Sequence, residues 1–149
     1  MNNHIPLELR EEALTCLNPD ERTLFLRLSP PDQRHSLDVH RASVVEWPND
    51  THLHVASLLH DVGKGRPSLF ERIAFSLLTT FAPWILLRWE HKSQNSGAGR
   101  IGNLLKHTCH SALLAELAGS HSAVVDAIES YGYREHEQGS RLARLDVTL

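Results

Sequence analysis

The sequence of 149 residues has few cysteines and no excess of basic charge. Its two cysteines, Cys16 and Cys109, have no second cysteine at metal-ligand spacing, which disfavours a disulfide framework and a thiolate zinc site. The formal net charge of −3 argues against a broad basic surface, so we expect no nucleic-acid partner. A small phosphate-bearing ligand needs only a few local cations and stays compatible with this charge.

A secretory signal and a long apolar run are also missing. The stretch MNNHIPLELREEAL has no basic start followed by an apolar segment, so a cytoplasmic location is the default expectation. The uncharged stretch IAFSLLTTFAPWILL (73–87) is shorter than the roughly 20 residues of a membrane span, and Pro83 interrupts it. We interpret it as two buried helices broken at Pro83. The alternative is an interfacial membrane contact through residues 73–89, because tryptophans and basic side chains there suit a headgroup boundary.

Sustained alternation of apolar and polar residues, which is typical of strands, is absent as well. Apolar residues recur instead at helical spacing, which predicts an all-α fold. Ser29 as N-cap, Pro30 in the first turn and Asp32 three residues after Ser29 predict a strong helix start. The expected helices cover residues 7–17, 19–28, 30–45, a segment from about 51, two within 69–89, and 101–118, 121–132 and 138–146.

One of these apolar helices ends on two polar side chains. In VASLLHDVGKG (55–65), apolar residues follow the spacing i, i+3, i+4, i+7, and His60 and Asp61 come directly after them. Burying a carboxylate is costly unless a charge or a hydrogen-bond donor receives it. Either the pair lies on the solvent side, with Gly63 as the C-terminal cap, or His60 and Asp61 share a metal ion.

Two more residues could complete such a metal site. His35 lies on the preceding predicted helix, and Asp146 lies on the last one. Helical bundles assemble metal sites from inward-pointing side chains of facing helices. Two imidazoles and two carboxylates suit a divalent Mn, Fe, Ni or Mg ion better than a closed structural zinc site. An ion with open positions can activate water or orient a phosphate.

These motifs resemble the signatures of the HD-domain metal-dependent phosphohydrolases. RHSLDV (34–39), LLHDVGKG with its histidine 25 residues after His35, and the late LARLD match the family's histidine, His-Asp pair and distal aspartate. The resemblance implies an HD-domain-like helical bundle in a single domain over 1–149. Residues 1–29 would form an N-terminal helical extension, and residues 30–146 the metal-binding core. It assigns His35, His60, Asp61 and Asp146 as metal ligands and implies hydrolysis of a phosphoester, often of a nucleotide.

The same resemblance bears on a second metal ion. KHTCHSA (106–112) is similar to a segment that holds a second metal in some members, with His107 at the matching position. A pair of histidines often closes the following helix in the family, whereas this chain has Ser130 and Tyr131 there. A mononuclear centre is therefore favoured, with His107 as a second-metal or substrate contact.

Roles in catalysis follow from the resemblance and from charge. Asp61 and Lys64 are the expected catalytic residues, and Lys64, Arg34 and Arg66 the expected phosphate contacts. Lys64 could instead only compensate the dipole of the helix C-terminus. The alternative function is an inactive regulatory or interaction module that keeps the fold and one metal. Surface or capping positions are expected for seven further histidines, His4, His40, His52, His54, His91, His110 and His121.

Overall fold

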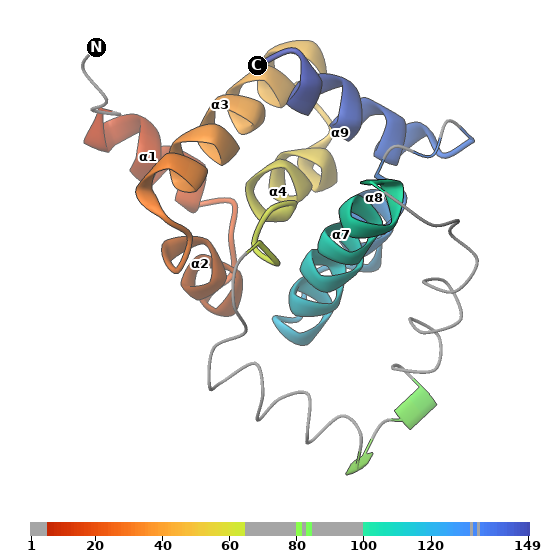
Figure 1. The fold of residues 1–149 in the computed structure, drawn as a ribbon. Coiled ribbons are helices and arrows are strands. Elements are labelled where there is room, and N and C mark those ends of the chain that lie inside the picture. The colour runs from red at the N-terminus through yellow and green to blue at the C-terminus, as the bar shows by residue number, and fades with distance from the viewer. Residues whose placement is uncertain (1–5, 65–79, 82, 85–99, 132, 134) are drawn as a thin grey trace.

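A computed structural model describes residues 6–64, 80–81, 83–84, 100–131, 133 and 135–149. Within these residues all regular structure is helical and no strand occurs, which confirms the all-α prediction (Figure 1). The helices form a compact bundle, and none in the described part is long and apolar enough to cross a membrane. Their bounds are α1 Leu7–Leu14, α2 Pro19–Leu26, α3 Pro30–Glu46, α4 Thr51–Leu59, α7 Arg100–Leu117, α8 Ser122–Glu129 and α9 Glu137–Val147.

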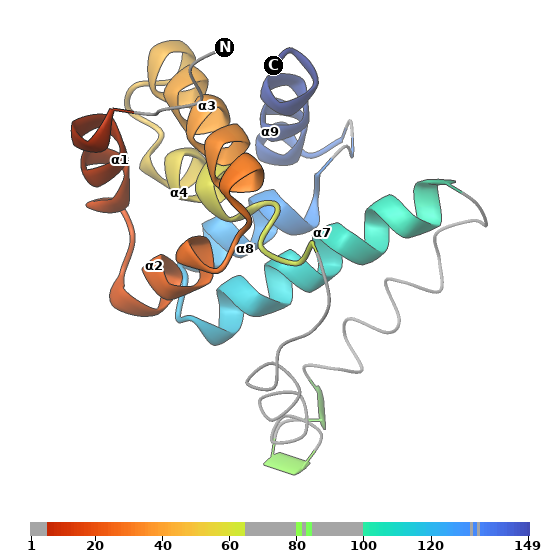
Figure 2. The ribbon, with the colours of Figure 1, turned by 60° about the vertical axis from the view of Figure 1, so that its left-hand side comes forward.

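Helix α4 is the centre of the bundle. It packs against α3 on one side and α8 on the other, and it also contacts α2, α7 and α9 (Figures 1 and 2). Its Leu53, Leu58 and Leu59 are fully buried, together with Phe25 of α2 and Ile128 of α8. Each buried side chain of this kind contributes about 1.5–3 kcal/mol of hydrophobic free energy. The residues that follow α4 therefore begin inside the protein rather than at its surface.

Local capping places the helix starts where the sequence predicts them. The Ser29 hydroxyl accepts a hydrogen bond from the backbone N–H of Asp32, with Pro30 in the first turn of α3. The Asp50 carboxylate caps α4 by accepting from the backbone N–H of Leu53 at 3.1 Å. Three helices end earlier than predicted: α1 at Leu14, α2 at Leu26 and α8 at Glu129. Tighter turns continue the chain after α1, so that Leu17 still reaches the core.

The interpretation of Gly63 as a C-terminal cap is wrong. Helix α4 ends at Leu59, and His60 follows it with right-handed backbone angles. In the part of the chain that the structure describes, the glycine with a positive φ is Gly119. Gly63 is buried, and its N–H donates a 2.8 Å hydrogen bond to the Ser111 hydroxyl of α7.

The surface assignment is also wrong for two histidines. His40 and His54 are buried. The His40 ring bonds the His54 carbonyl through Nδ1 at 3.1 Å, and His54 bonds the Trp47 carbonyl through Nε2 at 2.9 Å. Each ring therefore donates one N–H hydrogen bond to a backbone carbonyl. His121, by contrast, caps α8 as expected, and its ring stacks on His52 with centroids 4.4 Å apart.

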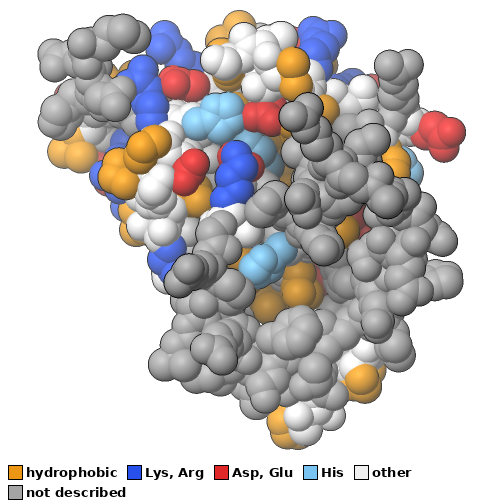
Figure 3. All heavy atoms as spheres, viewed as in Figure 1, with side chains coloured by type: hydrophobic (Ala, Val, Ile, Leu, Met, Phe, Trp, Pro, Cys, Tyr) orange, Lys and Arg blue, Asp and Glu red, His pale blue; other side chains and the backbone are white. Residues whose placement is uncertain are grey.

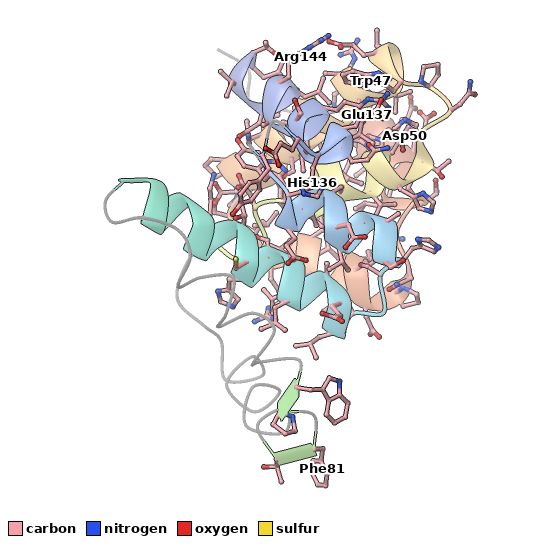
Figure 4. The ribbon with its side chains drawn as sticks, turned by 90° about the vertical axis from the view of Figure 1, so that its right-hand side faces the viewer. Trp47, Asp50, Phe81, His136, Glu137 and Arg144 are labelled. Atoms are coloured by element: carbon pink, nitrogen blue, oxygen red, sulfur yellow. The ribbon has the colours of Figure 1, made fainter. Side chains whose placement is uncertain are left out.

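The segment with a predicted helix break at Pro83 lies almost wholly outside the described residues. Of residues 73–89 the structure describes 80, 81, 83 and 84, with Phe81 and Trp84 exposed. Figure 4 labels Phe81. The two-helix interpretation and the interfacial alternative both stay predictions.

Candidate metal centre

Three of the predicted ligands meet where α3 passes the end of α4. A nitrogen of His35, a nitrogen of His60 and an oxygen of Asp61 all lie within 4.8 Å of one another. His60 is 3% exposed and Asp61 is 7% exposed, so the solvent-facing interpretation of this pair is wrong. The His35 side chain is 31% exposed and forms the outer edge of the cluster. These three side chains could hold a metal ion.

The fourth predicted ligand, Asp146, reaches the same place from α9. Its Oδ1 lies 2.6 Å from His35 Nε2 and 3.5 Å from His60 Nε2. Its Oδ2 accepts a hydrogen bond from the hydroxyl of Tyr131, which follows α8. The fold thus brings together residues that are separated by up to 111 positions in the chain.

Helix α9 is fixed over the centre by contacts to the turn between α3 and α4. Gln138 and Arg141 donate to the Asp50 carboxylate at 2.8 and 3.2 Å, and Arg144 donates to Glu46 at 2.6 Å. Both guanidinium groups also lie over the Trp47 ring, at 5.1 and 5.3 Å from its centroid. Figure 4 shows Trp47, Asp50 and Arg144 gathered at this junction. Asp146 lies on the same helix, so the bonds of Gln138 and Arg141 to Asp50 help to position it, whereas the largely exposed Arg144–Glu46 pair contributes little.

Among the described residues, the buried imidazole of His60 has one nitrogen without a hydrogen-bond partner. Its Nδ1 lies 2.8 Å from the Ser57 carbonyl, and because a carbonyl can only accept, the Nδ1–H is the donor. The Nε2 atom is buried and unpartnered, with Asp61 Oδ2 and Asp146 Oδ1 both 3.5 Å away. Leaving a buried polar atom unpaired costs about 1–3 kcal/mol. A divalent cation between this nitrogen and the carboxylates would remove that cost, so the residues present fit such an ion.

The electrostatics of the cluster favour positive charge. Burial disfavours a charged imidazole, but the carboxylates of Asp146 and Asp61 outweigh it and hold the pKa of His60 above its usual value. Burial likewise favours a neutral Asp146, yet the neighbouring His60 imidazole and the hydrogen bond from Tyr131 hold the pKa of Asp146 well below its usual range. Burial and the neighbouring Asp146 raise the pKa of Tyr131, so its hydroxyl keeps its proton.

Basic residues border the cluster on its exposed side. Lys64 Nζ lies 2.5 Å from Asp61 Oδ2, and its side chain is 47% exposed. Figure 3 shows histidine, acidic and basic side chains together on this face, over α3 and α4. Arg34, next to His35 in the chain, is partly exposed and pairs with Asp38 one turn further along α3, at 3.0 Å.

Two of the predicted site residues fall outside what the structure describes. Arg66 lies in the undescribed segment after Lys64. His107 belongs to the backbone of α7, but its side chain is not among the described ones.

Two residues that bear on the centre were not predicted from the sequence. Tyr131 continues the apolar spacing of Val124 and Ile128 just beyond the end of α8, and its hydroxyl at that position is the available sequence signal. Ser111 supports the turn of His60 and Asp61 through Gly63, and no local pattern marks it.

Comparisons with protein-family models, with curated proteins and with solved structures found no match.

Proposed function

We propose that the protein is a metal-dependent phosphohydrolase of the HD type, acting on a phosphoester of a nucleotide or a small phosphorylated metabolite. The observation that carries the proposal is the unpartnered, buried Nε2 of His60 beside His35, Asp61 and Asp146. A mixed nitrogen and oxygen set of this kind suits Mn, Fe, Ni or Mg. The motif resemblance to HD-domain phosphohydrolases supports the same assignment.

A bound divalent ion would lower the pKa of a coordinated water and polarise a phosphoryl group. Asp61 would hold the ion and accept a hydrogen bond from the attacking water. Lys64 can leave Asp61 for a phosphoryl oxygen, because nearly half of its side chain is exposed and its stem is flexible. Arg34, Arg66 and His107 are further contacts in this proposal, His107 to a second metal or to the substrate.

The exposed fractions indicate the direction from which a substrate would come. His60 and Asp61 close the centre on the core side, whereas His35 and Lys64 are partly exposed. A phosphate would therefore enter between His35 and Lys64, with its leaving group directed to solvent. Charge stabilisation by Lys64 would then act on the side where the negative charge develops.

The second candidate function is a regulatory or interaction module without turnover. The observation that favours it is that both carboxylates have partners from the chain itself. Lys64 pairs with Asp61, and Tyr131 bonds Asp146. In this case the cluster would stabilise the fold and bind at most one ion.

A phosphoester screen with added Mn²⁺ separates the two functions. The panel comprises p-nitrophenyl phosphate, bis(p-nitrophenyl) phosphate, nucleoside monophosphates and cyclic nucleotides, each given to the wild type, Asp61→Asn and Arg144→Met. The hydrolase predicts turnover that Asp61→Asn lowers at least about a hundredfold and that Arg144→Met leaves unchanged. Equal turnover in Asp61→Asn would contradict the proposal. A folded, metal-loaded wild type without any turnover would favour the regulatory module.

A further inference from the structure

Tyr131 contacts the centre from a segment that supplies none of its four expected ligands. It follows α8, and a 3.2 Å hydrogen bond from its N–H to the Ile128 carbonyl continues the last turn. Its ring lies nearly parallel to that of His60, at 6° with centroids 6.5 Å apart. Its hydroxyl donates to Asp146 Oδ2. The phenol thus touches the cluster through Asp146 rather than through a histidine.

The two oxygens of Asp146 therefore have different surroundings. Oδ1 faces the histidines, at 2.6 Å from His35 Nε2 and 3.5 Å from His60 Nε2. Oδ2 is held by Tyr131 on the opposite side of the carboxylate. Rotating the carboxylate so that both oxygens faced the histidines would break the bond to Tyr131. The carboxylate is thus set to offer one oxygen to a cation.

Close packing of α9 on the end of α8 holds Asp146 and Tyr131 at a fixed distance from each other. A Cβ added to Gly139 would lie 2.0 Å from the backbone oxygen of Ser130, so the two main chains are in direct contact there. Ser130 immediately precedes Tyr131, and Asp146 lies two helical turns beyond Gly139, on the same face of α9. The contact of Gly139 with Ser130 thus sets the distance between the phenol and the carboxylate.

From these contacts we propose that Tyr131 is a positioning residue for the metal centre. It fixes Asp146 as a ligand through one oxygen, and it thereby increases the affinity of the centre for a divalent cation. The inference rests on the proposed metal site, because the effect requires a bound ion. Removing an outer partner of a metal ligand typically costs about 10–100-fold in affinity.

The test is Mn²⁺ binding, measured by titration calorimetry and by the loss of the free-ion electron paramagnetic resonance signal. The variants are Tyr131→Phe, Asp146→Ala, the double variant of these two, and Tyr133→Phe. The last is a matched control, because Tyr133 is exposed and its ring packs against His136. We expect Tyr131→Phe to weaken binding at least about tenfold and Tyr133→Phe to leave it unchanged. In the Asp146→Ala background, Tyr131→Phe should change the affinity less than about twofold, because the partner is gone.

The outcomes separate this inference from the proposed function. A wild type that binds Mn²⁺ together with an equally tight Tyr131→Phe would overturn the role of Tyr131 and leave the metal site standing. An equal loss with and without Asp146 would show a merely structural role and overturn it too. A wild type that binds no Mn²⁺ would overturn both proposals.

If Tyr131→Phe does not fold, a crystal structure of the Mn²⁺-loaded wild type decides. One oxygen of Asp146 on the ion and the other on Tyr131 is the expected arrangement. Both oxygens on the ion, or Tyr131 turned away from Asp146, would overturn the inference.

Discussion

The buried hydroxyl of Ser111 accepts a hydrogen bond from the backbone N–H of Gly63, and this 2.8 Å contact joins α7 to the turn that carries His60 and Asp61. The two residues are 48 positions apart, so the bond links segments that only the folded chain brings together. Because the N–H of Gly63 is buried, the loss of its acceptor would leave a donor unpaired. The position of the turn that carries His60 and Asp61 therefore depends on a side chain of another helix.

Replacing this acceptor should destabilise the protein. We expect Ser111→Ala to lower the free energy of unfolding by about 1–3 kcal/mol, the cost of an unpaired buried donor. Ser36→Ala is the matched control, because Ser36 is equally buried and its hydroxyl has no hydrogen-bond partner within the described part of the chain. Urea denaturation should show Ser36→Ala within about 0.5 kcal/mol of the wild type or above it. Equal losses in the two variants would contradict a specific role for Ser111.

The contact between Gly139 and Ser130 gives a second prediction. An alanine in a helix usually stabilises it by about 1 kcal/mol relative to glycine. At Gly139 the added methyl would meet the Ser130 backbone, so α9 must shift and the cost should reach about 1–3 kcal/mol or more. Thermal denaturation and Mn²⁺ titration should both show a loss for Gly139→Ala. Ser140→Ala, at the exposed neighbouring position, should show neither, and a stabilised Gly139→Ala would contradict the account.

The helix starts could be predicted from the sequence because capping is local. Ser29 and Asp50 each bond a backbone N–H three residues ahead, and the signal is complete within one turn. The helix ends could not be predicted in the same way. The chain leaves α1 at Leu14 because packing draws the following residues into tighter turns, and that packing involves distant helices.

In the candidate site, too, the residues that belong to local motifs could be predicted, whereas those that depend on long-range packing could not. His60 and Asp61 are adjacent in a recognisable motif, and the resemblance to the HD-domain pattern suggests His35 and Asp146 as their partners. The contribution of Tyr131 depends on how α8 meets α9, and no local pattern encodes that crossing. Sequence alone predicts surface positions for His40 and His54, because histidine is often exposed. In the folded chain, backbone carbonyls accept their hydrogen bonds inside the protein.

Lys64 should compete with a metal ion for Asp61. Its ammonium lies 2.5 Å from Asp61 Oδ2, and such a half-exposed pair is worth up to about 1 kcal/mol. Lys64→Met should therefore raise the Mn²⁺ affinity in the absence of substrate by about two- to fivefold. The same variant should weaken inorganic phosphate binding to the Mn²⁺-loaded protein, because a phosphate contact is lost. Arg144→Met removes the ion pair with Glu46 and should change neither the Mn²⁺ affinity nor the phosphate affinity. Wild-type affinities in Lys64→Met would contradict the proposal that Lys64 moves from Asp61 to a phosphate.

Lowering the pH should reduce the free energy of unfolding, because the buried His40 resists protonation in the folded protein. Burial lowers the pKa of His40 despite its bond to the His54 carbonyl, so the unfolded chain takes up this proton at a higher pH than the native state. Stability contributed by neutral His40 is complete above about pH 6.5 and is lost as the pH falls toward the native pKa. The raised pKa of His60 acts in the opposite direction, but it is shared by all variants compared.

Urea denaturation at pH 7.5 and pH 5.5 measures this dependence. The drop in unfolding free energy between the two pH values should be smaller in His40→Gln than in the wild type. His136→Gln, which changes an exposed histidine, should keep the wild-type drop. An equal drop in His40→Gln would show that another group carries the pH dependence.

Metal content tests the central claim most directly. Wild type, Asp61→Ala and Arg144→Met are each dialysed to equilibrium against Mn²⁺, and the bound ion is counted by elemental mass spectrometry. The account predicts about one ion per wild-type chain, retained in Arg144→Met and lost in Asp61→Ala, because Asp61 and the unpartnered His60 nitrogen border the same position. A folded wild type without bound metal, or full occupancy in Asp61→Ala, would contradict it.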